Sequence, residues 1–476
     1  MTHVVVVGAG ISGLSAAYEL TGGLAASSSA PAVTVLEAAE VGGMLACATV
    51  GGRTVDVGPD AFLARRPEAV ALVGELCAAD ELIPIAATGA WVYARGRLRR
   101  LPASLALGVP TRLGAREAVG MLGLRGALRA AEDLVAPRPA SRSPLPDRAI
   151  GPLVADKLGQ RVVDVLVDPL VGGIHAGRVR DLSAAAVFPP LLAAGQQRGS
   201  LMRALRSATG ARSEAAPGPV FVTLRDGAGS LPGLVADVLK TRGVPCETGR
   251  QATLLRRGAA GAPRWIVETP GGDLLADAVI LATPAAVTSA LLGPLDGDAA
   301  AMLGAIDAAS VAVVTLRFAA VDVALPEEGT GVLVPGGTEG PSDAYLVTAV
   351  SFLDRKWPHL GRDGETLLRA SVGRIDDTRF QELDDNALVE RVTDELAALL
   401  EVQGAPLEAL VTRWPDAFPQ YRVNHLVRVE GVEAAAATLG GVAVAGAAYR
   451  GVGVPACIAS GRAAARAVRT WLVGQS

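Results

Sequence analysis

Aromatic residues make up only 4% of this chain of 476 residues, which also has only four cysteines and four histidines. Scarce aromatics argue against a stacking platform for single-stranded nucleic acid, and a net charge of −4 argues against a dedicated nucleic-acid binder. The cysteines (Cys47, Cys77, Cys246 and Cys457) form no CxxC pair, so we expect reduced thiols and neither a zinc site nor a disulfide scaffold. We therefore expect no metal centre and no nucleic-acid partner.

The sequence also lacks features that direct a chain into or across a membrane. Residues 4–7 are an apolar run with no charged segment or cleavage site before it, which predicts no secretory signal. No unbroken apolar run reaches the ~18 residues that span a bilayer. We expect a cytoplasmic protein, with peripheral contact to a membrane surface left open as an alternative.

The pattern of apolar residues predicts an α/β fold, α+β overall. A buried strand at residues 3–7, a glycine turn at 8–13, a helix at 14–20 and a strand at 33–37 indicate the start of a doubly wound parallel sheet. Residues 310–318, 344–352 and 366–372 predict an antiparallel sheet, and residues 385–400 predict an amphipathic helix. The chain ends in a predicted strand at 441–447, a glycine turn and a helix from about Pro455.

Changes of composition suggest where domains begin and end. Residues 95–129 hold eight arginines and one acidic residue, which would steer an anionic substrate, touch anionic lipid or form a solvated face. The stretches 136–148 and 207–219 predict mobile surface segments around a helical block, and residues 25–31 predict a surface loop. We predict a dinucleotide domain in three parts (1–85, 216–290 and 410–476), an inserted helical domain (86–215) and an antiparallel-sheet substrate domain (291–409).

The first glycine turn carries a dinucleotide motif. Gly8, Gly10 and Gly13 fit GxGxxG between a strand and a helix, where backbone can approach a pyrophosphate at the helix N-terminus. Glu37 ends the next strand and can accept hydrogen bonds from a ribose diol. This motif leaves NAD and FAD open, and the paired Gly42-Gly43 that follows favours FAD.

The last glycine turn, residues 445–455, favours a flavin as well. A buried strand leads into the turn, and Pro455 stands in the first turn of the helix that follows. The positive end of such a helix, aimed at the pyrimidine side of an isoalloxazine, stabilises the negative charge of a reduced flavin. No second GxGxxG follows a strand, so we expect no NAD(P)H site and an oxidase or desaturase that an external acceptor reoxidises.

Five segments in order along nearly the whole chain resemble the bacterial porphyrinogen oxidases: residues 58–67, 168–177, 357–358, 413–414 with 419–421, and 449–458. The resemblance implies an FAD domain, a substrate domain and a helical domain, and removal of six electrons from a porphyrinogen with O2 as acceptor and H2O2 as product. It favours coproporphyrinogen III, with protoporphyrinogen IX as the alternative. More distant alternatives are a flavin amine oxidase or carotenoid-type desaturase, and a porphyrin carrier without catalysis.

The same resemblance implies site residues and a partner that receives the product in the haem pathway. Met44 departs from the family pattern, in which Lys or Arg often follows the paired glycines. We expect an apolar substrate slot with cations at its mouth, where Arg66 pairs with a propionate or stays solvated, and where Gly173 and His175 approach the macrocycle. His175 is a structural histidine or a proton carrier, and no catalytic residue is assigned. The expected contacts of non-covalent FAD are Gly8, Ala9, Gly10, Ile11, Ser12, Gly13, Glu37, Ala38, Gly42, Gly43, Gly58, Pro59, Asp60, Ala61, Ala252, Trp414, Val452, Gly453 and Val454.

Overall fold

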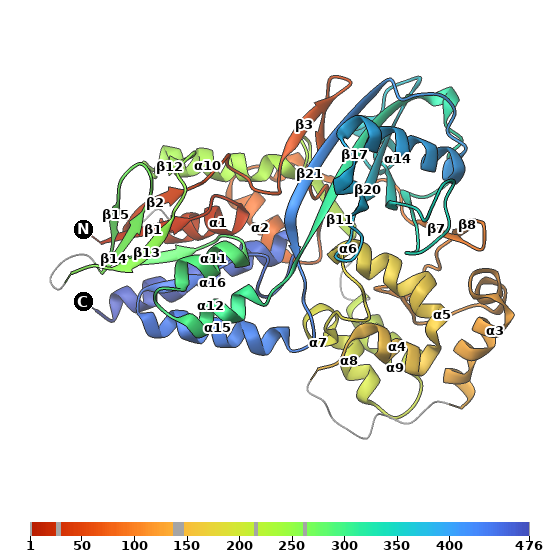
Figure 1. Ribbon diagram of the computed structural model, residues 1–476, viewed down its shortest axis with the longest axis horizontal. Helices are drawn as coiled ribbons and strands as arrows, with labels where there is room; N and C mark the ends of the chain where they lie inside the picture. Colours follow the sequence, from red (N-terminus) through yellow and green to blue (C-terminus); the bar gives the residue numbers. More distant parts are fainter. Residues whose placement is uncertain (1, 25–29, 137–146, 214–217, 260–263, 476) are drawn as a thin grey trace.

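The computed structural model describes residues 2–24, 30–136, 147–213, 218–259 and 264–475. Most of the predicted loop at 25–31 and of the predicted segment at 136–148 therefore lies outside the described residues. Figure 1 shows a body with a parallel sheet that contains both chain ends, a second body around a long antiparallel sheet, and a block of helices below it.

The parallel sheet has five strands in the order β12 (Cys246–Glu247), β2 (Ala32–Leu36), β1 (His3–Val7), β16 (Ala278–Leu281) and β22 (Val442–Val444). Val4 and Val6 of β1 pack toward α1 (Ile11–Leu20), α10 (Leu231–Thr241) and α16 (Val454–Val473). Val5 and Val7 pack on the opposite face toward α11 (Ala285–Leu292), α12 (Gly297–Gly304) and α15 (His425–Leu439). A parallel sheet covered on both faces explains the uninterrupted run of valines, and the predicted fold class is confirmed.

The antiparallel body contains a seven-stranded sheet in the order β21 (Glu408–Pro419), β17 (Ala308–Ala319), β20 (Glu365–Val372), β19 (Val347–Phe352), β18 (Gly331–Leu333), β7 (Trp91–Ala94) and β8 (Arg97–Arg100). The helix α14 (Asp385–Leu400) has the bounds that its apolar spacing predicts. Its Leu388, Val392 and Leu396 are fully buried in the same core as Phe318 and Phe352 of the sheet.

The helical block comprises α3 (Ala115–Val135), α4 (Ile150–Leu158), α5 (Gln160–Val162), the π-helical turn η2 (Val163–Gly172), α6 (Gly173–His175), α7 (Ala184–Val187), α8 (Pro189–Gln196) and α9 (Leu201–Ser213). The prediction of a mobile segment at 207–219 is wrong for 207–213, because α9 continues to Ser213 with Leu205 buried in the core of the block. The domain limits stay predictions. Among the described residues, no helix is both long and apolar enough to cross a bilayer.

Shorter elements connect these bodies. A hairpin of β3 (Cys47–Val50) and β4 (Arg53–Asp56) leads into β5 (Phe62–Leu63) and α2 (Pro67–Glu75). A small sheet joins β5, β11 (Phe221–Leu224) and β6 (Leu82–Pro84), and another joins β13 (Leu254–Arg257), β14 (Trp265–Glu268) and β15 (Leu274–Ala276). The helix α13 (Leu353–Lys356) follows β19.

Candidate functional site

The first and last helices of the chain pack directly on each other and bring two glycine turns together. A Cβ on Gly461 of α16 would lie 2.0 Å from the carbonyl oxygen of Ser12 in α1, so only glycine permits this approach. The turn at residues 8–13 before α1 and the turn at 451–453 before α16 therefore lie at neighbouring helix N-termini, although the sequence separates them by most of its length. Helix N-termini favour anionic groups.

The glycines of the first turn have different structural reasons. Gly8 has φ +104°, and a Cβ on it would lie 2.6 Å from the carbonyl oxygen of Ala282. A Cβ on Gly13 would lie 1.9 Å from the carbonyl oxygen of Gly8. A Cβ on Gly10, by contrast, would meet no protein atom within 4 Å. The protein does not itself need glycine at position 10, and the free space at this helix N-terminus fits a ligand pyrophosphate.

Glu37 lies beside this turn, at the end of β2. Its Oε2 accepts a hydrogen bond from the backbone N–H of Ala9 at 2.7 Å, and its Oε1 accepts one from Ala39 at 2.9 Å. A carboxylate has about four acceptor positions, so capacity remains for hydroxyl donors of a ribose. The N–H of Arg250 donates to the carbonyl of Glu37 at 2.8 Å, which brings the loop that contains Ala252 to the same place.

The paired glycines close the other side of the turn. The N–H of Gly42 donates to the carbonyl of Ala9 at 3.0 Å, and a Cβ on Gly43 would lie 3.6 Å from the Cα of Gly10. Gly42 and Gly43 have φ of +121° and +60°, which glycine adopts with little cost. The structure thus brings the predicted phosphate and ribose contacts of the first 43 residues together.

The segment that follows the hairpin lies against the antiparallel sheet. A Cβ on Gly58 would lie 1.8 Å from the carbonyl oxygen of Met44. The indole Nε1 of Trp414, from β21, donates to the carbonyl of Val57 at 2.8 Å. Trp414 is therefore adjacent to the segment 58–61, as expected for residues that contact one cofactor.

The side chain of Asp60 is turned into the protein. Its carboxylate is paired with the Lys356 ammonium at 2.7 Å and the Arg369 guanidinium at 3.4 Å. Burial raises the pKa of Asp60, but these two cations outweigh it and hold that pKa well below its usual range. A cofactor contact of Asp60 through its side chain is therefore disfavoured, and a contact through its backbone stays a prediction.

The turn before α16 is held by a tyrosine from another part of the chain. The Oη of Tyr421 accepts a hydrogen bond from the N–H of Gly451 at 2.9 Å and donates one to the carbonyl of Ala447. Gly453 is the N-cap of α16, and Pro455 occupies its first turn. The predicted contacts Val452, Gly453 and Val454 lie at this helix start, where N–H groups lack partners within the helix.

The candidate substrate residues lie in two different bodies. Gly173 and His175 form α6 in the helical block, and a Cβ on Gly173 would meet no protein atom within 4 Å. Burial lowers the pKa of His175 to about 4, so its ring is neutral at neutral pH. Arg66 is the exposed N-cap of α2, which packs on α16. Arg66 and His175 therefore belong to different bodies, and packing within one body does not bring them together.

Sequence analysis missed three cations whose side chains are largely buried. Lys356 and Arg369 hold Asp60, and Arg374 pairs with Asp168 at 2.7 Å while only 2% exposed. Within the described part of the chain, Nε and Nη2 of Arg374 are buried without a hydrogen-bond partner. Arg369 lies in β20, a strand whose residues are mostly buried, and a charged residue in such a strand is the sequence signal that could have found it.

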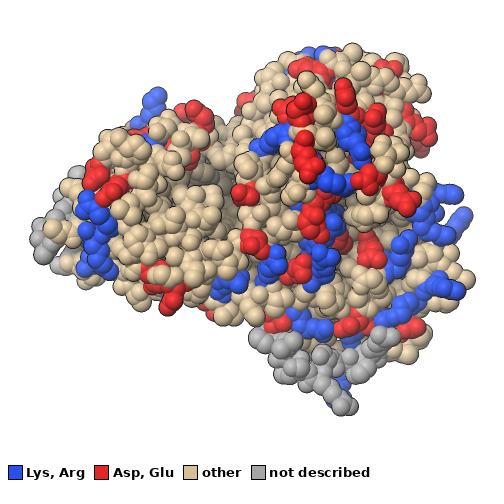
Figure 2. All heavy atoms as spheres, viewed as in Figure 1, with Lys and Arg blue, Asp and Glu red and all other residues tan. Residues whose placement is uncertain are grey.

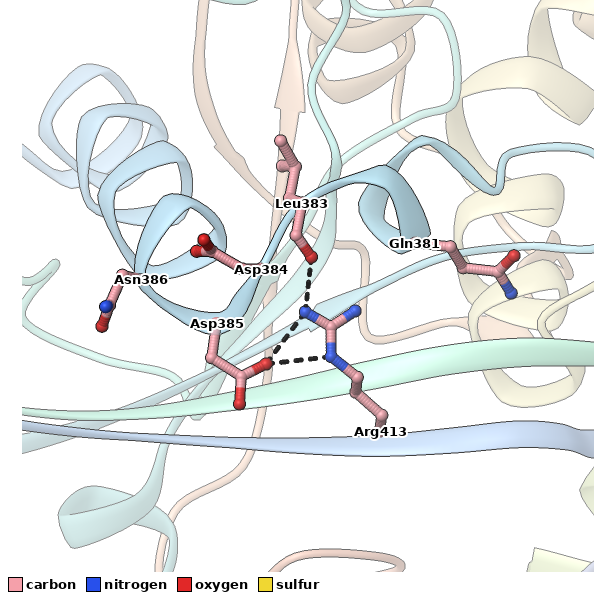
Figure 3. A pocket seen from close by; sticks show the side chains of 6 residues that line it. All are labelled: Gln381, Leu383, Asp384, Asp385, Asn386 and Arg413. Carbon is pink, nitrogen blue, oxygen red and sulfur yellow. Dashed lines mark hydrogen bonds and ion pairs between the residues drawn. The ribbon is translucent and has the colours of Figure 1, made fainter.

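A separate hollow of about 590 Å³ lies at the start of α14, away from these turns. Figure 3 shows Arg413 pointing toward Asp385 and the carbonyl of Leu383, with which its guanidinium forms hydrogen bonds. A third bond joins Arg413 to the carbonyl of Phe380 at 3.2 Å. Because its cation is engaged by the protein, this hollow offers little for an anionic ligand, and we do not assign it to the cofactor or substrate.

The chain is similar in sequence and in structure to known proteins. The sequence profile of the flavin containing amine oxidoreductase family matches residues 11–469. The coproporphyrinogen III oxidase of Bacillus subtilis is 31% identical over 99% of this chain and 98% of its own length. That of Mycobacterium leprae is 35% identical over 96% of each chain. A crystal structure from Exiguobacterium sp. 255-15, provisionally named a protoporphyrinogen oxidase, superposes with a TM-score of 0.85 at 28% identity, covering 98% of this chain and 99% of its own.

Proposed function

The chain belongs to the flavin containing amine oxidoreductase family, and within it we propose that the chain oxidises coproporphyrinogen III to coproporphyrin III. The observation that carries the proposal is similarity over nearly the full length to two coproporphyrinogen III oxidases, at 31% and 35% identity. Family membership confirms the prediction of FAD as the cofactor. The free space at Gly10 and the two adjacent helix N-termini fit this cofactor in the structure.

The reaction removes six electrons and six protons from a colourless macrocycle. Three molecules of O2 accept them and leave as three molecules of H2O2. When bound, FAD supplies the two-electron acceptor for each step. The product is aromatic, which supplies much of the driving force, so the protein mainly has to hold and orient the ring.

Different groups of residues bind the different parts of the cofactor and the substrate. We assign the dinucleotide to the turns around Gly10, Glu37 and Gly43, and the reactive ring to the segment 58–61, Trp414 and the start of α16. The α6 segment with Gly173 and His175 lies in the helical block and supplies one wall for the macrocycle. Since His175 is neutral and buried, it excludes water and shapes this wall rather than carrying charge. Arg66 pairs with a propionate at the mouth.

The test is turnover by purified protein. Coproporphyrinogen III should yield a fluorescent porphyrin and three equivalents of H2O2, with the flavin bleached under anaerobic conditions and restored by O2. Protoporphyrinogen IX is the second candidate and is measured beside it, because the similar Exiguobacterium structure is provisionally named a protoporphyrinogen oxidase. It has two propionates where coproporphyrinogen has four. Reduction of the bound flavin by putrescine or benzylamine, and by neither porphyrinogen, would overturn the proposal in favour of amine oxidation.

We place the enzyme in the cytoplasm, in contact with anionic membrane through α3. Leu124, Leu128 and Val135 of this helix are 64%, 61% and 83% exposed. Figure 2 shows basic side chains along the margin of the molecule where Figure 1 places β8 and α3. Exposed leucines beside arginines are typical of helices that lie in a membrane interface. Co-sedimentation with anionic vesicles, lost in a Leu124→Gln/Leu128→Gln variant, tests this location.

A further inference from the structure

Residues 420–425, here named the connecting segment, join β21 to α15 and contact two turns that come from distant parts of the chain. One is the turn at residues 172–177, which contains the candidate substrate residues. The other is the turn at 447–453, which precedes α16. Each contact is made by a buried polar group of the connecting segment, as the following distances show.

Gln420 holds the substrate-side turn. Its Nε2 donates to the carbonyl of His175 at 2.9 Å, and the residue is only 3% exposed. A Cβ on Gly177 would lie 2.4 Å from Oε1 of Gln420, so the amide lies directly on this turn. The N–H of Ser183 adds a bond to the carbonyl of Tyr421 at 2.7 Å. The side chain of Gln420 therefore fixes the turn at 172–177 to the connecting segment, and the backbone bond fixes the chain a few residues beyond that turn.

Tyr421 holds the flavin-side turn. Its hydroxyl donates a hydrogen bond to the carbonyl of Ala447 and accepts one from the N–H of Gly451, so it holds both ends of this stretch. The residue is 1% exposed, and burial raises its pKa far above the usual range, so the hydroxyl keeps its proton. Gly451 has φ +152°, a backbone conformation that favours glycine.

His425 fixes the orientation of the tyrosine. The two rings stack with centroids 3.9 Å apart and an interplanar angle of 15°. Nε2 of His425 donates to the carbonyl of Tyr449 at 2.8 Å, a third bond to the same turn. His425 is fully buried, and burial lowers its pKa to about 4, so the ring is neutral and its proton stays on Nε2.

We propose that Tyr421 is a positioning residue that sets the turn at 447–453 against the flavin ring, while Gln420 sets the turn at 172–177 against the substrate. One short rigid segment thus fixes the distance between the two reactants. This inference rests on the proposed function for the assignment of the two turns. It adds that FAD affinity and the flavin midpoint potential depend on Tyr421, and that substrate affinity depends on Gln420.

The experiment compares Tyr421→Phe with the unmodified holoenzyme. Phenylalanine keeps the stacked ring but leaves the N–H of Gly451 and the carbonyl of Ala447 without their partner. We expect the dissociation constant of FAD, measured by titrating apoprotein and following flavin fluorescence, to rise about tenfold. The flavin midpoint potential should fall, because α16 no longer stabilises the reduced ring as well. Tyr345→Phe, in the core of the antiparallel body, is the matched control and should change neither quantity.

A second variant separates the two halves of the inference. Gln420→Leu should leave FAD affinity and midpoint potential unchanged and raise KM for coproporphyrinogen III about fivefold or more. Unchanged FAD affinity and potential in Tyr421→Phe would overturn the inference, and so would a Gln420→Leu variant with unaltered KM. Both FAD measurements need no porphyrinogen. An unmodified flavoprotein that oxidises no porphyrinogen would therefore refute the proposed function while the flavin result for Tyr421 still stands.

Discussion

The ammonium of Lys356 lies 2.7 Å from Oδ2 of Asp60, although 296 positions separate the two residues in the sequence. Lys356 ends α13 in the antiparallel body, and Asp60 belongs to the segment that we assign to the flavin ring. Arg369 adds bonds from the same body to the carbonyl oxygens of Asp56 and Gly58, at 3.3 and 3.0 Å. The ion pair at the buried Asp60 and the bonds from Arg369 therefore fix the flavin segment to the antiparallel body.

Replacement of Lys356 by methionine should destabilise the protein by about 3 kcal/mol. Loss of one partner from a buried pair typically costs ~3–5 kcal/mol, and Arg369 remains to share the charge of Asp60. Urea unfolding of the FAD-bound protein measures the change. Lys240→Met, at an exposed position in the last turn of α10, is the control and should stay within about 0.5 kcal/mol of the unmodified protein. Equal stability of the two variants would show that the pair contributes nothing.

Gly10→Ala and Gly13→Ala should have opposite consequences. The methyl group at position 10 meets no protein atom within 4 Å, so the chain should fold normally but bind FAD at least about tenfold more weakly. The methyl group at position 13 would lie 1.9 Å from a backbone oxygen, so that variant should lose stability and melt at a lower temperature. Flavin content after purification and the melting temperature of the apoprotein separate the two effects. Full FAD occupancy in Gly10→Ala would contradict our placement of the pyrophosphate.

Local pattern was enough to predict several elements of the fold, including those that form the first part of the dinucleotide site. The run of valines at residues 4–7, the GxGxxG turn and the helix at 385–400 each follow from apolar spacing and glycine placement within one stretch of sequence. The helix α14 even has the predicted bounds, because its N-cap Asp384 accepts a bond from Ala387 and its apolar face is continuous. Such short-range rules do not depend on the rest of the chain.

Long-range polar contacts could not be predicted in the same way. Nothing near Lys356 in the sequence indicates that its partner is Asp60, and nothing near Tyr421 indicates a bond to Gly451. The prediction of a mobile segment at 207–219 is wrong for 207–213 for a related reason. Its composition is typical of a surface loop, whereas residues 207–213 continue a helix whose buried face is supplied by the preceding turns of α9.

The neutral, buried His425 should make stability depend on pH. Its pKa is about 4 in the folded protein against an ordinary value of 6.5, so the unfolded chain binds more protons between these values. The stability that comes from the neutral state of His425 is therefore complete above pH 6.5 and is lost as the pH falls toward 4. When the pH falls from 7.5 to 4.5, the free energy of unfolding should decrease by about 2–3 kcal/mol less in His425→Gln than in the unmodified protein. Asp56, whose pKa is raised to about 6, has the opposite effect on the pH dependence of stability, but it is present in both the variant and the unmodified protein. Unfolding curves with equal pH dependence would refute this.

Arg66 provides the most direct test of how the carboxylate arms are recognised. The side chain is exposed at the N-cap of α2, so pairing with a propionate should be worth about 1 kcal/mol and be weakened by salt. Arg66→Gln should therefore raise KM for coproporphyrinogen III about fivefold with little change in kcat. Arg65→Gln removes the same charge one position earlier, also at an exposed residue, and should leave KM nearly unchanged. Long-range electrostatic attraction alone would make the two substitutions raise KM by the same factor. Equal effects of the two variants would therefore mean that Arg66 does not contact the substrate and contributes only to the general positive potential.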